Sequence, residues 1–189
     1  DLAYKYFPQF DHQELAKDAW KNFKNCKNML FKRLNKDIPT IRVGHSLGCK
    51  LHLISPDGGR NCKKFISISF NNFGANKSIP FLKNISQSLE FESEFSPSPN
   101  KTLTIIEKTY IQNNNLLIKF DSDKLDQTES LLSSLRIRDK DNSKGVLLKG
   151  NHTLIASAGF REEFLGKWAD DSLKRKTIIK ICDLIDSFS

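Results

Sequence analysis

Several common sequence features are missing from this chain of 189 residues. Its four cysteines form no C-x-x-C pair and lie at no metal-type spacing from a histidine, which favours free thiols in a reducing compartment. No apolar run approaches the roughly 20 residues of a membrane span, and the start does not resemble a secretory signal. These absences argue against a metal module and a transmembrane segment, and we expect a cytoplasmic location.

Glycine is scarce and unevenly placed, since none of the nine glycines precedes Gly44. The chain begins with Asp1, and its one methionine is Met29. A chain made from a natural start codon begins with methionine before processing. We therefore interpret this sequence as a fragment, a processed form or a trimmed chain.

Positive charge exceeds negative charge, with 30 Lys and Arg against 22 Asp and Glu and a net charge of +8. A nucleic-acid partner would favour clustering of these charges. They are instead spread through the expected helices and mixed with acids, and the richest patch is Lys174-Arg175-Lys176. No RNP, helix-turn-helix or zinc pattern accompanies them. We therefore expect a solvated basic surface and no nucleic-acid partner.

Hydrophobic periodicity predicts an alternation of helices and strands. Asp11 and Glu14 form the pattern of a capping box before an amphipathic helix over 12–34. The apolar stripe of that helix consists of Leu15, Ala19, Phe23, Cys26, Leu30 and Leu34, widened by Trp20. Short β-branched or apolar runs predict strands at 40–44, 65–70, 116–120 and 145–149.

Further helices are predicted after the first strand, over 126–135 and at the C-terminus. The C-terminal helix carries the apolar positions Leu173, Ile178, Ile179, Cys182, Ile185 and Phe188. Strands that alternate with helices are typical of a parallel sheet covered on both faces. The sequence therefore predicts one α/β domain over residues 1–189.

The pentapeptide Gly44-His45-Ser46-Leu47-Gly48 is the most informative motif. It reads G-x-S-x-G, which is typical of the nucleophile elbow of α/β-hydrolases, where a serine lies on a sharp turn between a strand and a helix. We expect side chains larger than glycine at Gly44 and Gly48 to collide in so tight a turn. The strand predicted before the motif and the helix predicted after it supply the required context.

A nucleophilic serine needs a histidine to accept its proton and an acid to orient that histidine. In α/β-hydrolases these residues follow in the order Ser, Asp or Glu, His, each just past the end of a strand. Asp123 is favoured as the acid because of its offset past the strand at 116–120. Asp126 is the alternative acid and would otherwise cap the next helix, whereas Asp121 lies very close to the strand end.

Four histidines compete for the role of general base. His152 follows the strand at 145–149 and completes the expected order. His12 precedes Ser46 in the sequence, and His52 lies down the helix from the elbow. His45 lies inside the elbow, where we expect its side chain to point elsewhere. His152 is therefore the predicted base.

The oxyanion hole of such a site needs two donors. The backbone N–H of Leu47, directly after the nucleophile, is the first candidate. The second donor normally comes from a loop after an early strand, and no HGGG-like or other glycine loop precedes Gly44. Loss of one such donor costs on the order of 100- to 1,000-fold in rate. Either upstream sequence is missing or the chain is a damaged hydrolase.

Several stretches of the chain resemble an uncharacterised α/β-hydrolase-like family of cyanobacteria and plant plastids, domain of unknown function 1350. They are Phe10 to Gln13, Val43 to Leu53, Ile68 to Phe73, Phe95 to Pro99, Asn115 to Phe120, Asp126-Gln127 and Gly150 to Thr153. The resemblance implies an α/β-hydrolase fold in a photosynthetic organism, in the plastid stroma if it is a eukaryote. It supplies no substrate. Family members usually carry an N-terminal strand and a glycine-containing loop that are absent here.

Two functions from different classes follow. The first is a serine hydrolase for a small-molecule ester or thioester, with Ser46, Asp123 and His152 as the triad and no metal or organic cofactor. The second is a non-catalytic binding or assembly factor on the same fold. The proline-interrupted segment over about 73–114 would be a cap with an apolar acyl pocket, or merely connecting helices. Its apolar residues are Ile79, Phe81, Leu82, Ile85, Leu89, Phe91 and Phe95.

Overall fold

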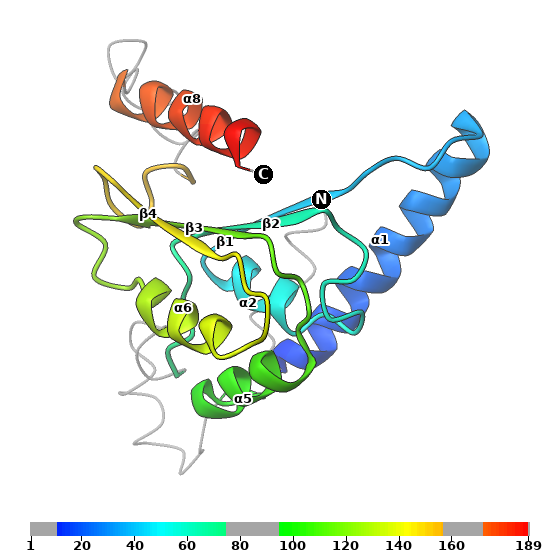
Figure 1. Cartoon of the computed structure of the whole chain (residues 1–189), viewed down its shortest axis with the longest axis horizontal. Coiled ribbons are helices and arrows are strands. Elements are labelled where there is room, and N and C mark those ends of the chain that lie inside the picture. The colour runs from blue at the N-terminus through cyan, green and yellow to red at the C-terminus, as the bar shows by residue number, and fades with distance from the viewer. Residues whose placement is uncertain (1–10, 75–94, 157–171, 189) are drawn as a thin grey trace, which may run out of the picture.

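Four parallel strands form the central sheet, in the order β1 (Ile41–His45), β2 (Lys64–Ile68), β3 (Asn115–Phe120) and β4 (Lys144–Leu148). A computed structural model describes residues 11–74, 95–156 and 172–188 of the chain (Figure 1). Each predicted strand is present, with bounds that differ by one or two residues. The predicted parallel sheet is therefore confirmed, and the carboxyl ends of all four strands lie at one edge.

Helices cover both faces of this sheet, as the alternating pattern predicted. Those of the described residues are α1 (His12–Leu34), α2 (Leu47–Leu53), α5 (Pro99–Thr109), α6 (Thr128–Arg136) and α8 (Ser172–Ser187). Figure 1 shows α2, α5 and α6 on one side of the sheet and α8 on the other. The α/β architecture is therefore that of a three-layer sandwich.

The core is divided by the sheet because successive strand side chains point to opposite faces. Phe65 and Leu117 pack with Ile106 and Leu131 on the face covered by α2, α5 and α6. The next side chains along the same strands belong to a second cluster, which includes Ile181 of α8. Both central strands are thus buried on both faces, which explains why β2 and β3 read as nearly continuous apolar runs.

Helix α1 has the predicted bounds but not the predicted burial. Asp11 caps it, since one carboxylate oxygen accepts hydrogen bonds from the backbone N–H groups of Gln13 and Glu14 at 3.0 and 2.9 Å. The buried residues of this helix are His12 and Ala16, which are not part of the expected apolar stripe. In that stripe Leu15 is only half-buried, and Leu30 and Leu34 are 47% and 52% exposed. The reason is geometric: α1 packs on α2 with its first turns, and its later turns project away from the sheet (Figure 1).

The buried stripe of α8 also differs from the sequence prediction. Ile178, Ile179 and Cys182 are exposed, and the side that faces the sheet carries Thr177 and Ile181 together with the half-buried Leu184 and Ile185. The helix is rotated so that residues at i, i+4 and i+7 meet the sheet.

The end of α8 is docked by a lysine at the start of β2. Lys64 Nζ donates to the carbonyl oxygens of Ile185 and Phe188, both at 2.5 Å. The last carbonyls of a helix have no intrahelical donor and carry partial negative charge, so a cation there is stabilising.

The segment at 73–114 is described only in part. Residues 75–94, which include most of the apolar residues proposed for an acyl pocket, lie outside the described residues. Helix α5 packs into the core through Ile106 and Tyr110, and Phe95 is buried against the ring of His12. The cap over an active site and the single-domain extent of 1–189 stay predictions.

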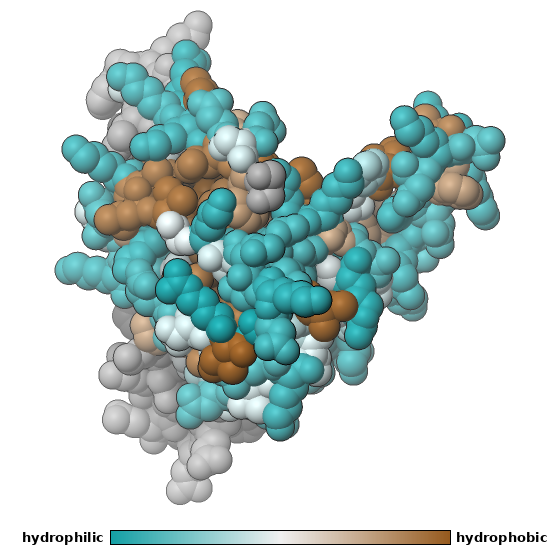
Figure 2. Space-filling view, viewed as in Figure 1, coloured by the Kyte–Doolittle hydropathy of each residue, from teal (hydrophilic) through white to brown (hydrophobic). Residues whose placement is uncertain are grey.

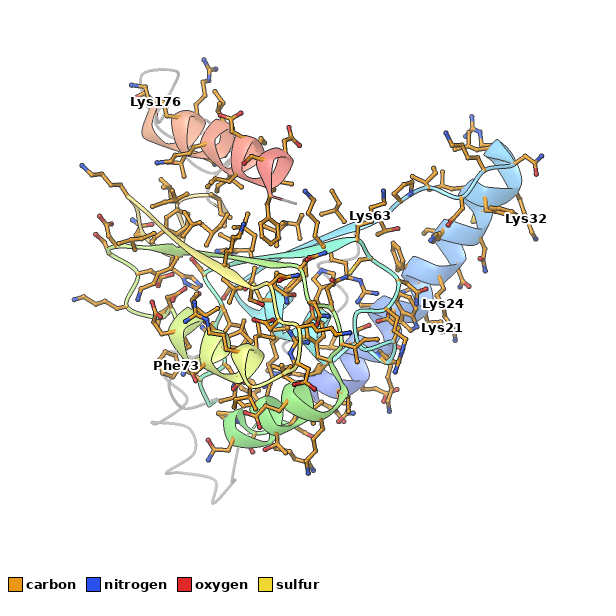
Figure 3. The ribbon with its side chains drawn as sticks, in the orientation of Figure 1. Lys21, Lys24, Lys32, Lys63, Phe73 and Lys176 are labelled. Atoms are coloured by element: carbon orange, nitrogen blue, oxygen red, sulfur yellow. The ribbon has the colours of Figure 1, made fainter. Side chains whose placement is uncertain are left out.

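Lysine side chains are numerous on α1 and also occur on other elements. Figure 3 shows Lys21, Lys24 and Lys32 on α1, Lys63 before β2 and Lys176 on α8. Figure 2 shows a largely hydrophilic face with an apolar patch between β4 and α8. Within the described residues, no helix is long and apolar enough to cross a bilayer.

Candidate active site

Ser46 lies on a strained turn between a strand and a helix. It follows the last residue of β1 and precedes Leu47, the first residue of α2, with φ 54° and ψ −122°. This positive φ is unfavourable for serine and costs on the order of 1–3 kcal/mol. The backbone N–H of Ser46 donates to the Ile68 carbonyl of β2 at 3.0 Å, which helps to hold the turn. The side chain is half-buried and stands at the carboxyl edge of the sheet.

The two motif glycines are not equivalent. A Cβ on Gly44 would lie 2.7 Å from Cys49 N and 2.8 Å from Cys49 Cα, so only glycine lets the helix start this close to the strand. A Cβ on Gly48 would meet no heavy atom of the described residues within 4 Å. The expectation that both glycines are required by sterics is therefore correct for Gly44 and wrong for Gly48, because Gly48 borders an open apolar groove beside α1.

The structure brings Ser46, His152 and Asp123 together from three different strand ends. His152 Nε2 lies 2.8 Å from Ser46 Oγ, and His152 Nδ1 lies 2.8 Å from Asp123 Oδ2. A carboxylate only accepts, so these partners assign the ring proton to Nδ1 and leave Nε2 to accept from the Ser46 hydroxyl. The side chain of Asp123 is fully buried and that of His152 is 17% exposed. Such a chain of hydrogen bonds is the arrangement used for nucleophilic catalysis.

The three candidate acids have different partners. Asp123 has a second, orienting contact, because its Oδ1 accepts from the backbone N–H of Leu125 at 2.9 Å. Asp126, the alternative acid, accepts from the backbone N–H and the hydroxyl of Thr128, both at 2.9 Å. Burial raises the pKa of Asp126. Asp126 thus holds the first residue of α6, which is the role that its sequence position left open.

Asp121 connects two loops at the edge of the site. Its Oδ1 accepts from the backbone N–H of Gly150 at 3.1 Å, a bond that lowers the pKa of the Asp121 carboxyl. A second bond joins the same loops, because the N–H of Ser122 donates to the Gly150 carbonyl at 3.0 Å. The loop after β3 and the loop after β4, which carries His152, are thereby joined.

The other histidines have partners of their own. His52 Nε2 lies 3.2 Å from the Val43 carbonyl, and burial lowers the pKa of its ring. Burial, together with the nearby Lys50, lowers the pKa of His12 to about 4. His45 Nε2 lies 2.8 Å from the carbonyl oxygen of His152 itself. Among the described residues, His152 is the histidine hydrogen-bonded to the Ser46 hydroxyl.

Sequence reasoning missed the contacts of His45 and Asp121. Neither residue has a local signal that would reveal them, since the His45 contact spans 107 positions and the Asp121 contact spans 29. Both depend on which loops meet above the sheet.

Leu47 occupies the position predicted for an oxyanion donor. It is the first residue of α2, and the first N–H groups of a helix have no intrahelical acceptor. No second donor was identified from the sequence, and its source stays open. Among the described residues, no group of three or more His, Cys, Asp or Glu side chains is placed to hold a metal ion.

The chain is similar to several solved structures. The α/β-hydrolase GrgF from Penicillium sp. sh18 is similar over 96% of this chain and 74% of its own, with a TM-score of 0.50 and 10% identity. A monoacylglycerol lipase from Paleococcus ferrophilus is similar over 89% of this chain and 75% of its own, with a TM-score of 0.47 and 12% identity. An esterase domain of a Rhodothermus marinus protein is similar over 82% of this chain and 68% of its own, with a TM-score of 0.46 and 17% identity.

At such low identity the likeness to GrgF shows the fold alone. None of the curated proteins matches the chain in sequence. One family does, over residues 2–171, and its description is that of a protein of unknown function. The chain therefore has an α/β-hydrolase fold and belongs to the family described as "Protein of unknown function (DUF1350)".

Proposed function

We propose that this protein is a serine hydrolase that cleaves an ester or thioester bond, with Ser46 as nucleophile, His152 as general base and Asp123 as the orienting acid. The observation that carries the proposal is the unbroken chain of two 2.8 Å hydrogen bonds from Ser46 Oγ through His152 to Asp123. Two further features support it. The serine is on a strained elbow, and the buried Asp123 has no rival acid at His152 Nδ1 among the described residues.

Acylation begins when Ser46 Oγ attacks the acyl carbon and His152 Nε2 takes the hydroxyl proton. The resulting imidazolium is stabilised by Asp123, which stays ionised. Negative charge that develops on the acyl oxygen faces the N–H of Leu47. His152 then gives its proton to the leaving alkoxide or thiolate, which leaves an acyl group on Ser46.

Deacylation repeats these steps with water. His152 Nε2 takes a proton from water as the water oxygen attacks the acyl carbon, and then returns a proton to Ser46 Oγ as the acid leaves. Every atom and proton is supplied by the substrate, water and these side chains. The residues that would contact the acyl chain lie largely outside the described residues, so an apolar substrate stays a prediction.

A fluorophosphonate probe tests the proposal directly. An activated Ser46 Oγ attacks phosphorus, fluoride leaves, and a stable phosphonyl-serine forms. We expect labelling of the wild type and none of Ser46→Ala. Ser133→Ala is the matched control, because Ser133 lies exposed on α6 and its hydroxyl only donates to the Glu129 carbonyl.

A folded wild-type protein that remains unlabelled, or labelling that survives in Ser46→Ala, would contradict the proposal. The alternative from the sequence, a binding or assembly factor on the same fold, would then be the better interpretation.

A further inference from the structure

We infer that His45 is a positioning residue for His152, holding the backbone of the general base over the nucleophile; this inference rests on the proposed function. The contact that carries it is the 2.8 Å bond between His45 Nε2 and the carbonyl oxygen of His152. The two rings lie side by side, with centroids 5.2 Å apart. His45 thus contacts both the nucleophile, as its neighbour in the chain, and the base, as its hydrogen-bond donor.

The chemistry of this contact fixes the state of His45. A carbonyl oxygen can only accept, so Nε2 of His45 must carry the proton. Burial lowers the pKa of the His45 ring, and His152 and Asp123 are the charged or titratable groups that act on it from the loops after β4 and β3. His45 is therefore a neutral donor near pH 7, and it adds no positive charge beside the base.

The fold explains why the base needs this anchor. Ser46 follows β1 and His152 follows β4, and β2 and β3 lie between those strands. Neighbouring strands are about 4.8 Å apart, so the loop after β4 must extend across three spacings, about 14 Å, to bring the imidazole to Ser46.

The other backbone contacts of that loop do not reach β1. Gly150 is joined to the loop after β3, and the N–H of Leu154 donates to the Asn151 carbonyl within the turn at 3.1 Å. Among the hydrogen bonds of the described residues, the one from His45 is the bond that ties the backbone of this loop to β1. Without it, the hydrogen bonds that place His152 within the described residues are those of its ring to Ser46 and Asp123 and those of Gly150 to the loop after β3.

A displacement of a catalytic group by about 1 Å can cost on the order of 100-fold in rate. We expect His45→Leu to lower kcat for a p-nitrophenyl ester, and the rate of fluorophosphonate labelling, by about 10- to 100-fold. KM should stay within about threefold, because a positioning role acts through the backbone of His152 and not through a contact with the acyl group. A defect in KM alone, or no defect, would overturn the inference.

Rescue separates positioning from loss of packing. Glutamine carries an N–H donor at nearly the reach of His45 Nε2, so His45→Gln should recover most of the lost kcat. His52→Leu is the matched control, because His52 also bonds a backbone carbonyl but lies away from the site. Its kcat should equal that of the wild type. If His45→Leu fails to fold, His45→Met removes the donor with an unbranched side chain.

A spectroscopic readout keeps this inference independent of turnover. The Nδ1 proton of His152, shared with Asp123, should give a downfield NMR signal that disappears in His152→Gln. The signal should broaden or shift in His45→Leu and not in His52→Leu. If the wild type is not labelled but its His152 signal still changes in His45→Leu, the proposed function alone would be refuted. If the wild type is labelled and His45→Leu changes neither the His152 signal nor kcat, the role of His45 alone would be refuted.

Discussion

Replacement of Asp123 by asparagine is the sharpest perturbation of the proposed mechanism. The change keeps the shape of the side chain, removes its charge and replaces one acceptor oxygen by an NH₂ donor. The contacts of Asp123 dictate how the new amide must lie: Oδ1 accepts from the Leu125 N–H at 2.9 Å, so the amide oxygen keeps that place. The NH₂ group then faces His152 Nδ1, where Asp123 Oδ2 lay at 2.8 Å.

The consequence is a change of tautomer. An amide N–H donates, so His152 Nδ1 must become an acceptor and the ring proton moves to Nε2. Nε2 then faces the Ser46 hydroxyl as a donor and cannot take its proton. The same replacement in a Ser-His-Asp triad costs about 10⁴-fold in kcat. At 1.36 kcal/mol for each factor of ten, that is about 5.4 kcal/mol of lost transition-state stabilisation.

The assay compares two carboxylates, Asp123 and Asp126, by the rates at which their asparagine variants are labelled by the fluorophosphonate and hydrolyse a p-nitrophenyl ester. Asp123→Asn should lose about 10⁴-fold. Asp126→Asn should stay within about tenfold, since Asp126 bonds Thr128 and not His152. Thermal unfolding of each variant shows that the fold is kept. If Asp126→Asn gave the large loss and Asp123→Asn the small one, or if both stayed near the wild-type rate, the reasoning from hydrogen-bond geometry would be refuted.

Two further predictions concern the elbow and its support. Gly44→Ala should lower both the free energy of unfolding and the rate of labelling, because its Cβ would lie 2.7 Å from Cys49 N. The free energy of unfolding of Gly48→Ala should stay within about 1 kcal/mol of the wild-type value. Equal effects of the two variants in urea unfolding would contradict this prediction. Arg42 Nη2 lies 2.6 Å from Asp57 Oδ2. Burial opposes ionisation of the Asp57 carboxyl, but its hydrogen bonds prevail and lower its pKa from 3.8 to about 2. Asp57 therefore stabilises the fold by about 2 kcal/mol above pH 4, and this is lost as the pH falls towards 2. The stability gap between wild type and Asp57→Asn should shrink over that range.

Strand positions and the order of the site residues could be predicted because they depend on local pattern. Apolar runs of β2 and β3 are short and bounded by polar residues, so their type and approximate bounds follow from the sequence. The order serine, aspartate, histidine, after the first, third and fourth strands, selected Ser46, Asp123 and His152, which the structure brings within hydrogen-bond distance.

Helix burial was harder to predict, because an apolar stripe shows amphipathicity and not what covers it. In α1 the buried residues are His12 and Ala16, beside the predicted stripe, whereas Leu30 and Leu34 of the stripe are exposed. In α8 the residues Ile178 and Ile179 are apolar but face away from the sheet, because the helix is rotated towards Ile181.

The sequence by itself determined the α/β class, the elbow at Ser46 and the candidate acids and base, because periodicity and spacing are properties of short segments. Only the tertiary structure showed which of the three acids lies beside His152 and revealed the contact of His45, because both depend on which loops meet at the carboxyl edge of the sheet. Asp121, Asp123 and Asp126 lie within six positions of one another, yet one reaches Gly150, one His152 and one Thr128. Side-chain direction separates them, and only the packed loops fix that direction.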